Sequence, residues 1–187
     1  MRTGAYPGSF DPPTTAHLAV ALAAVEQCGL DRVDLVLSEV ALGKVEHHVR
    51  LADRFAVLGA IADGDPRLGA TVSPHRLLVD IAEGYDVVIM GADKWAQVVD
   101  PRWYGGEAAR DEAVAALPAV AVAPRPGFDV PRSGIELDVA TIHGDVSSSA
   151  ARTGAHELMA PEAAAFAAAT GAWVEPDRYA RWLAGRA

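Results

Sequence analysis

Short runs of apolar residues alternate along the chain with segments in which apolar residues recur every three or four positions. Runs such as VDLVL and DVVIM are rich in β-branched residues and apolar at nearly every position, which is typical of parallel strands that are buried on both faces. The alternation of strands and helices predicts an α/β fold, a parallel sheet with helices on both faces. The predicted strands are Arg2–Tyr6, Val33–Leu37, Leu68–Val72, Asp86–Met90, Ala119–Ala123 and Val139–Ile142.

The first predicted helix has an apolar stripe at positions i, i+3, i+4 and i+7, formed by Leu18, Ala21, Leu22 and Val25. Gly29 follows the stripe and predicts a left-handed cap that ends this helix. Further helices are predicted at His48–Ala62, Pro74–Glu83 and Glu107–Leu117.

The C-terminal region predicts two more helices, because APEAAAFAAATG and EPDRYARWLAG each place a proline at the helix start and a glycine at its end. Tyr179, Trp182 and Leu183 form one apolar stripe, so the last helix is expected to pack on the body of the protein. No linker or internal repeat interrupts the pattern. We therefore predict a single domain over residues 1–187, with an α/β core at about 1–145 and packed C-terminal helices at about 146–187.

Composition mainly excludes other classes of protein. No apolar run reaches membrane-spanning length and no secretory pattern opens the chain, so a cytoplasmic protein without a membrane partner is expected. The formal net charge of −9, without any basic block, argues against a nucleic-acid partner. Cys28 is the only cysteine, and His47 and His48 have no partner at metal-ligand spacing, so no protein-held metal site is predicted.

Polar or glycine-rich segments follow five of the six predicted strands. The carboxyl ends of parallel strands meet at one edge of a sheet, and ligands of open α/β sheets bind there. These segments coincide at one rim, which predicts a ligand site. They are Gly8-Ser9-Phe10-Asp11, Ser38 to Lys44, Gly91-Ala92-Asp93, Pro124-Arg125 and Ser147-Ser148-Ser149.

The stretch YPGSFDPPTTAHL joins the first predicted strand to the first helix. Thr14 or Thr15 caps that helix, which leaves His17 in its first turn, where backbone N–H groups and the helix dipole favour an anion. Gly8 would let the backbone approach a phosphate closely. Taken alone, the stretch fits equally well a prolyl turn with a threonine cap and a half-exposed histidine, or a phosphate cradle.

A second stretch, DVSSSAAR, opens another helix with a serine cap and places Arg152 one turn later. Hydroxyls, amides and a guanidinium can converge there on a phosphate. An ordinary cap with a solvated arginine is the commoner explanation of such a stretch by itself. Two such helix starts at the same rim favour a triphosphate site.

Two cations between these stretches leave alternatives open. Lys44, in the loop ALGKVEHH, is either solvated or positioned over a polyphosphate. Arg54 lies on a helix stripe that should face the core, so it either pairs with a buried carboxylate or reaches a ligand beneath the rim.

The segment that contains Trp95, Trp103 and Tyr104 is predicted to be irregular. Exposed rings there would suit stacking on a base, whereas a satellite core under a loop is the default interpretation. The motifs G-x-x-x-x-G-K-[ST], G-x-G-x-x-G and G-x-S-x-G do not occur, so the chain is not a P-loop enzyme.

Two stretches resemble the signatures of the adenylyltransferase–cytidylyltransferase superfamily. GSFDPPTTAH is similar to its (H/T)-x-G-H signature and VSSSAAR to its I-S-S-T-x-x-R signature, in this order and with Lys44 between them. Within that superfamily GADKW, Trp103, APRPG and the two-helix tail resemble the nicotinate (or nicotinamide) mononucleotide adenylyltransferases. The resemblance implies a Rossmann-like nucleotidyltransferase fold with a C-terminal helical tail, and transfer of AMP from ATP to the mononucleotide, with release of pyrophosphate, in NAD biosynthesis.

The resemblance also implies roles for individual residues. His17, Lys44 and Arg152 would be catalytic, through positioning and charge stabilisation without a covalent intermediate, and Mg²⁺ would accompany ATP. The acceptor would contact Lys44, Arg54, Trp103 and Arg125. ATP would contact Gly8, Ser9, Phe10, Thr14, His17, Gly91, Asp93, Ser147, Ser148, Ser149 and Arg152.

The chain also departs from the family pattern. Ala16 stands where the second signature histidine is usually preceded by glycine, Thr14 replaces the first histidine, Ser149 a threonine and Lys94 an asparagine. Thr14 and the opening YPGSFDP are closer to the phosphopantetheine adenylyltransferases, which are the alternative enzyme class. A nucleotide-binding module that has lost turnover is the alternative of another class. The expected partners are ATP and a phosphorylated small molecule, and a homo-oligomer is left open.

Overall fold

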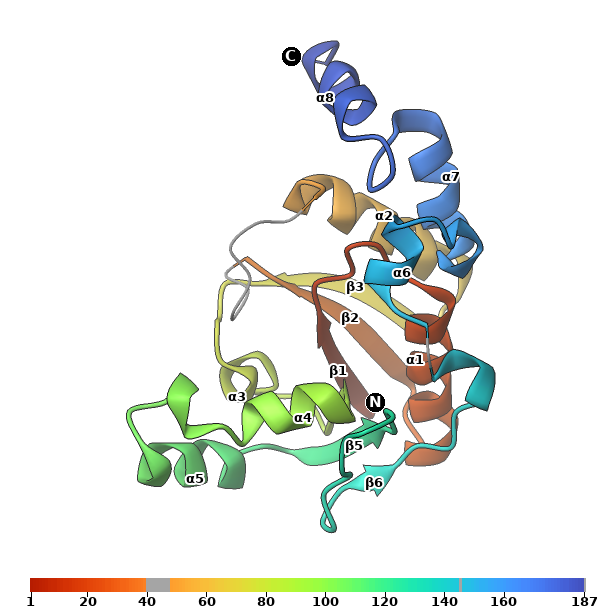
Figure 1. Cartoon of the computed structure of the whole chain (residues 1–187). Helices are drawn as coiled ribbons and strands as arrows, with labels where there is room; N and C mark the ends of the chain where they lie inside the picture. The colour runs from red at the N-terminus through yellow and green to blue at the C-terminus, as the bar shows by residue number, and fades with distance from the viewer. Residues whose placement is uncertain (40–47, 145, 187) are drawn as a thin grey trace.

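The computed structural model of the chain describes residues 1–39, 48–144 and 146–186 (Figure 1). Within them, six strands form one sheet in the order β3-β2-β1-β4-β5-β6, and each pair of neighbours is parallel. This confirms the predicted α/β fold with a parallel sheet. The strand order reverses between β1 and β4, which is where ligands bind in doubly wound sheets. The strands are β1 (Thr3–Gly8), β2 (Arg32–Ser38), β3 (Leu68–Ser73), β4 (Val87–Gly91), β5 (Ala119–Ala123) and β6 (Ile135–Glu136).

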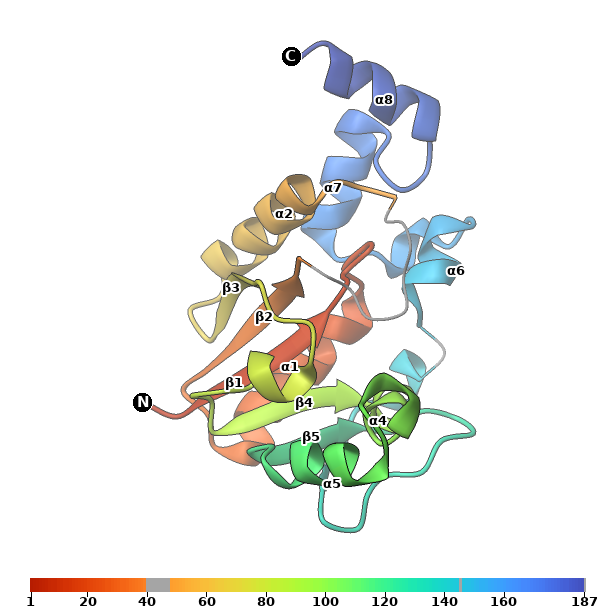
Figure 2. The ribbon, with the colours of Figure 1, turned by 90° about the vertical axis from the view of Figure 1, so that its left-hand side faces the viewer.

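Successive strand residues face opposite helical layers, as the pleat of a strand requires. Leu35 and Ile89 belong to the core that also contains residues of α1 (Thr15–Cys28), α2 (Leu51–Gly64) and α7 (Pro161–Thr170). Val88 and Met90 pack with residues of α3 (Leu78–Ile81), α4 (Ala92–Val98) and α5 (Glu107–Ala115). Figure 2 shows α1 behind the sheet and α3, α4 and α5 in front of it.

The C-terminal segment consists of α6 (Ser148–Arg152), the short 3-10 helix η3 (His156–Leu158), α7 and α8 (Pro176–Ala184). Proline occupies the first turn of α7 and of α8, and Gly171 ends α7 in the left-handed conformation, as the sequence predicted. The Tyr179 side chain is buried in the main core, and Trp182 and Leu183 pack against it. No helix in the described ranges combines the length and apolar character that crossing a membrane requires.

The sixth strand was predicted in the wrong place. Residues 139 and 140 have no regular structure, and Thr141–His143 form a 3-10 helix (η2). The sheet instead pairs β5 with Ile135–Glu136. The chain then leaves the sheet because the Gln27 side chain binds both backbone groups of Asp138: the Asp138 N–H donates to Oε1 (2.9 Å), and Nε2 donates to the Asp138 carbonyl (2.8 Å).

Two helix predictions and the prediction of one irregular segment also need correction. α2 begins at Leu51 rather than His48, because the His48 and Arg50 amides donate to Asp11 Oδ2 (3.2 Å) and Tyr179 Oη (3.2 Å) instead of starting a helix. The helix predicted from Pro74 is confined to α3, because Ser38 Oγ donates to the His75 carbonyl (2.7 Å) and holds the preceding residues extended. The segment predicted to be irregular contains α4 and η1 (Pro101–Trp103), which are too short to show a clear periodicity.

Candidate active site at the carboxyl end of the sheet

The first loop, Ser9–Thr14, leaves β1 at the point where the strand order reverses. Phe10 has a positive φ of 43°, which is uncommon for a residue other than glycine, and its side chain is 1% exposed. Its ring packs edge-on against Tyr6, with centroids 5.7 Å apart, and lies 5.1 Å from the His17 ring. A Cβ at Gly8 would lie 3.0 Å from the Phe10 ring. The structure therefore gives Gly8 a second reason besides phosphate approach: it makes room for Phe10.

Thr14 and His17 form a reciprocal cap at the start of α1. The Thr14 hydroxyl accepts from the His17 amide (3.4 Å), while the Thr14 amide donates to His17 Nδ1 (3.0 Å). Since Nδ1 accepts this hydrogen bond, the neutral imidazole carries its proton on Nε2. His17 thus takes the place of the Glu or Gln of an ordinary capping box, and the cap fixes both its ring and its tautomer.

Asp11 anchors the first loop to two distant segments. Its carboxylate is 2% exposed, and Oδ1 accepts a hydrogen bond from the Trp173 indole N–H (2.8 Å). Oδ2 accepts from the backbone N–H of His48 (3.2 Å). Neither Asp11 nor Trp173 was among the site residues predicted from the sequence. The available signal was the position of Trp173 shortly after Gly171, the glycine that ends α7. This signal does not identify Asp11 as the hydrogen-bond partner.

The second predicted phosphate stretch contacts the first loop directly. Ser147 caps α6 by accepting from the Ala150 amide (3.1 Å). Ser148 Oγ donates to the Pro12 carbonyl (2.8 Å), and Arg152 donates to the Asp11 carbonyl and to Ser149 Oγ. Figures 1 and 2 both show α6 beside the loop that leaves β1. The structure therefore brings together the two stretches that resemble superfamily signatures.

The ends of β4 and β5 form a neighbouring part of the rim. Arg125 Nε lies 3.9 Å from Asp93 Oδ1, and its guanidinium donates to the carbonyls of Gly144 (2.8 Å) and Val146 (3.0 Å), just before α6. A Cβ at Gly91 would lie 2.5 Å from Asp93 Oδ1, so glycine makes room for that carboxylate. Burial raises the pKa of Tyr6, with Arg125 lowering it and Asp93 raising it, which places all three groups in one electrostatic neighbourhood.

Three further predicted site residues are Arg54, Trp103 and Lys44. Arg54 is 2% exposed and donates to the carbonyls of Val49 (3.0 Å) and Ser9 (2.6 Å). Burial lowers its pKa, while the charge of Asp11 opposes that shift. Trp103 lies in η1, and among the described residues its buried indole Nε1 has no hydrogen-bond partner. Lys44 lies outside the described residues, so its predicted role stays a prediction.

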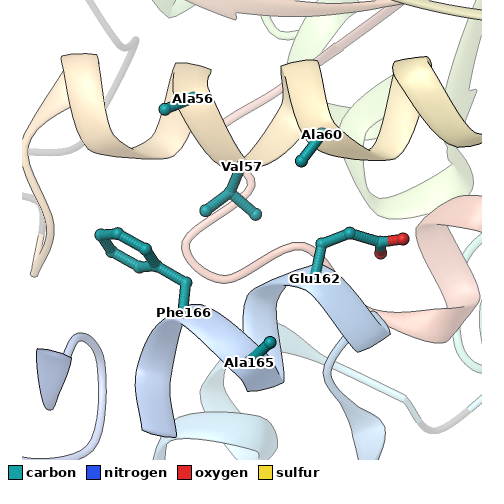
Figure 3. Close-up of a pocket in the computed structure, with 6 residues that line it drawn as sticks. All are labelled: Ala56, Val57, Ala60, Glu162, Ala165 and Phe166. Carbon is teal, nitrogen blue, oxygen red and sulfur yellow. The ribbon is translucent and has the colours of Figure 1, made fainter. Parts of the chain in front are cut away.

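A groove between α2 and α7 has a volume of about 350 Å³ and contains none of the predicted site residues (Figure 3). Its walls are apolar apart from the Glu162 side chain, whose carboxylate Figure 3 shows at one end. The chemistry-bearing side chains gather instead at the carboxyl ends of β1, β4 and β5. The lining residues are Ala56, Val57, Ala60, Glu162, Ala165 and Phe166.

The parallel sheet with its reversal between β1 and β4, and the two polar stretches that meet there, define a nucleotidyltransferase-type Rossmann-like fold. The cytidylyltransferase-like family model matches residues 5–154, and the chain belongs to that family. The resemblance expected from the two signatures is thereby confirmed.

Three curated relatives and one solved structure are similar to this chain. Proteins described as probable nicotinate-nucleotide adenylyltransferases are 29% identical in Rubrobacter xylanophilus (72% of this chain, 66% of the relative) and 29% in Bordetella petrii (67% and 66%). A third, from Bacteroides fragilis, is 30% identical over 74% of this chain and 72% of its own length. The matched region thus spans just under two thirds of the first two relatives. The fold is also similar to Plasmodium falciparum nicotinic acid mononucleotide adenylyltransferase complexed with NaAD, with a TM-score of 0.68, 15% identity and coverage of 92% of this chain and 97% of that one.

Proposed function

We propose that this chain is an adenylyltransferase that transfers AMP from ATP to nicotinate or nicotinamide mononucleotide, releasing pyrophosphate, in NAD biosynthesis. The observation that carries the proposal is the direct contact between the first loop and α6, which brings His17, Ser148 and Arg152 to one rim. The names of the curated relatives support the nicotinate acceptor.

The reaction needs charge stabilisation and alignment rather than a nucleophilic side chain. An oxygen of the acceptor phosphate bonds to the α-phosphorus of ATP, while the bond from that phosphorus to the α,β-bridging oxygen breaks and its electron pair leaves with pyrophosphate. We assign to His17 the donation of its Nε2 proton in a hydrogen bond to a phosphate oxygen. Arg152 and the serines that open α6 bind the β- and γ-phosphates in this scheme.

Thr14 acts in this proposal through His17. Its side chain is fully buried (0% exposed), and its hydroxyl lies 2.6 Å from His17 Nδ1. That geometry supports a role in orienting the imidazole rather than direct contact with ATP. Arg54 is likewise better supported as a buried anchor of the first loop than as an acceptor ligand, because its donors reach backbone carbonyls.

Mg²⁺ enters this proposal as part of the Mg-ATP substrate. In residues 1–39, 48–144 and 146–186, no group of three or more His, Cys, Asp or Glu side chains is arranged to hold a metal ion. Phosphate oxygens and water commonly supply most ligands of this ion. Its charge would lower the cost of bringing two phosphorylated substrates together.

Ala16 bears on the alternative of a module without turnover. Its side chain is 2% exposed, so the methyl group that replaces the family glycine is packed inside the protein instead of standing at the rim. This placement supports an active enzyme.

The test is an acceptor panel with the purified chain and Mg-ATP. Nicotinate mononucleotide, nicotinamide mononucleotide and phosphopantetheine are offered separately, pyrophosphate release is followed, and the adenylylated product is identified by mass. Formation of a dinucleotide with either mononucleotide is the expected result. Turnover with phosphopantetheine alone would replace the proposal by the coenzyme A alternative. ATP binding by calorimetry without pyrophosphate from any acceptor would indicate a binding module.

A further inference from the structure

Two side chains of the C-terminal segment donate hydrogen bonds to buried carboxylates of the α/β core. Trp173, which follows α7, donates its indole N–H to Asp11 Oδ1 (2.8 Å). Tyr179, on α8, donates its hydroxyl to Asp53 Oδ2 (2.5 Å), close to the start of α2. The two bonds are chemically alike, but only the first one reaches the loop that leaves β1.

Asp11 connects Trp173 to the proposed site through both its side chain and its backbone. The second carboxylate oxygen accepts from the His48 amide (3.2 Å). The carbonyl of the same residue accepts a hydrogen bond from the Arg152 guanidinium. A movement of Asp11 would therefore move the acceptor that orients Arg152.

The first loop needs such support, because its backbone is held in an unfavourable conformation. Phe10, directly before Asp11, has a φ of 43° although it is not glycine, and Trp173 itself has a φ of 65°. Such conformations are energetically unfavourable and persist where the surrounding structure holds them in place. Trp173 is 5% exposed and packs against Phe166 with ring centroids 5.9 Å apart, so its indole is fixed from the tail side.

We infer that Trp173 is a positioning residue for adenylyl transfer: by donating to Asp11 it presets the first loop, and with it Arg152, before ATP binds. The inference rests on the proposed function for its kinetic consequence. Its structural content, that the hydrogen bond from Trp173 to Asp11 helps to hold the first loop, does not depend on which reaction the site performs.

The experiment compares the unmodified chain with Trp173→Phe and Tyr179→Phe. Each variant keeps an aromatic ring and removes one tail donor to a buried carboxylate, but only Trp173→Phe loses a contact with the first loop. Steady-state kinetics with Mg-ATP and the mononucleotide give kcat and KM separately. Amide hydrogen exchange of peptides that cover residues 8–17 reports how firmly the first loop is held, whether or not there is turnover.

For Trp173→Phe we expect kcat to fall about tenfold or more, the loss typical of a hydrogen bond to a charged group, with the KM for the mononucleotide within about threefold of the unmodified chain. Exchange in residues 8–17 should accelerate to a similar degree. Tyr179→Phe should leave kcat within about twofold and accelerate exchange around residues 50–58 instead. Asp11→Asn tests the same contact from the acceptor side. Both oxygens of the Asp11 carboxylate accept hydrogen bonds, from the Trp173 indole and from the His48 amide. In asparagine one of these oxygens becomes an N–H₂ donor, so one of the two hydrogen bonds is lost.

The inference is overturned if Trp173→Phe and Tyr179→Phe change kcat equally, or if exchange in residues 8–17 is unchanged in both Trp173→Phe and Asp11→Asn. Loss of folding in Trp173→Phe, seen as a missing thermal transition, transfers the decision to Asp11→Asn. If the unmodified chain turns over no acceptor, the proposed function fails, and the exchange data still decide whether Trp173 holds the loop.

Discussion

The two predicted ends of the candidate site, one for the phosphates and one for the acceptor, are held in place in different ways. At the end formed by the first loop and α6, the hydrogen bonds join residues far apart in the chain: Trp173 to Asp11, Arg152 to Asp11 and Ser148 to Pro12 are separated by 162, 141 and 136 positions. In the segment around η1, the bonds are local. There the Arg102–Asp100, Tyr104–Val98 and Arg110–Val99 pairs are separated by 2, 6 and 11 positions.

This difference indicates that the overall fold determines the first loop and α6, whereas the local sequence determines the segment around η1. The first loop cannot change without disturbing α6 and the C-terminal segment, because these segments supply its hydrogen-bond partners. The segment around η1 can change its side chains with few consequences elsewhere. Such an arrangement suits an enzyme whose phosphate chemistry is shared within a family and whose acceptor differs among members. Arg125 connects the start of α4 with the residues that precede α6, since it approaches Asp93 and also donates to the carbonyls of Gly144 and Val146.

The largest expected effect is on His17, at the long-range end. Removing a donor that stabilises developing charge typically costs about a hundred- to a thousandfold in kcat, and we expect this loss for His17→Ala. The same change removes the acceptor of the Thr14 amide and should cost about 1 kcal/mol of unfolding free energy. His17→Glu separates the two effects, because glutamate completes the cap but carries no donor.

Kinetics and urea unfolding of both His17 variants provide the measurement. Stability should be highest for the unmodified chain, lower for His17→Glu and lowest for His17→Ala. Activity should instead be lowest for His17→Glu, because the negative charge of glutamate repels phosphate. Activity that follows stability instead would show that His17 serves only as a cap.

Caps of this kind were predictable from the sequence, and the contacts between distant segments were not. Thr14 was one of two candidate caps for the start of α1. Ser147 opens α6 and Gly29 ends α1, as predicted. Each of these signals lies within a few residues of the helix that it begins or ends. The bond between Asp11 and Trp173 leaves no local pattern, because either residue could satisfy its polar atoms elsewhere. The two-residue β6 and the seven-residue α4 are too short for a periodicity to identify.

The next largest effect is expected from substitution of Arg54. This substitution tests whether Arg54 anchors the first loop inside the protein or contacts the acceptor. Replacing Arg54 by leucine leaves the Val49 and Ser9 carbonyls without their donor and removes a positive charge that interacts with the buried Asp11 carboxylate. We therefore expect the free energy of unfolding to fall by about 3 kcal/mol. Arg50→Leu is the matched control. Its side chain is 56% exposed and pairs with Asp53, so its loss should lower the free energy of unfolding clearly less than the loss of Arg54 does. Urea unfolding measures both. A higher KM for the mononucleotide at unchanged stability would restore Arg54 to the acceptor site.

Arg152 gives a smaller effect, expressed in ATP use. Arg152→Ala removes a charge-assisted contact and should lower kcat/KM for ATP about ten- to a hundredfold, or about 1.5–3 kcal/mol. Arg152→Lys should recover only part of this loss, because an ammonium cannot bind the Asp11 carbonyl and a phosphate with the same fork geometry. Calorimetry of ATP binding checks the assignment. Unchanged affinity and rate in Arg152→Ala would make Arg152 a surface residue.

The smallest effect is expected at the locally built end. Trp103→Phe keeps an aromatic ring and removes an indole N–H that has no partner within the described part of the chain, so thermal stability should not fall. If that N–H or the wider ring contacts the acceptor, the KM for the mononucleotide should rise about fivefold, the value of about one hydrogen bond, while the KM for ATP stays unchanged. Trp95→Phe is the control in the neighbouring helix, since Trp95 packs against a core cluster and its truncation should lower stability without changing either KM. A rise in the KM for ATP in Trp103→Phe would mean that this end is coupled to the phosphate end after all, and that the local hydrogen bonds understate how the two ends communicate.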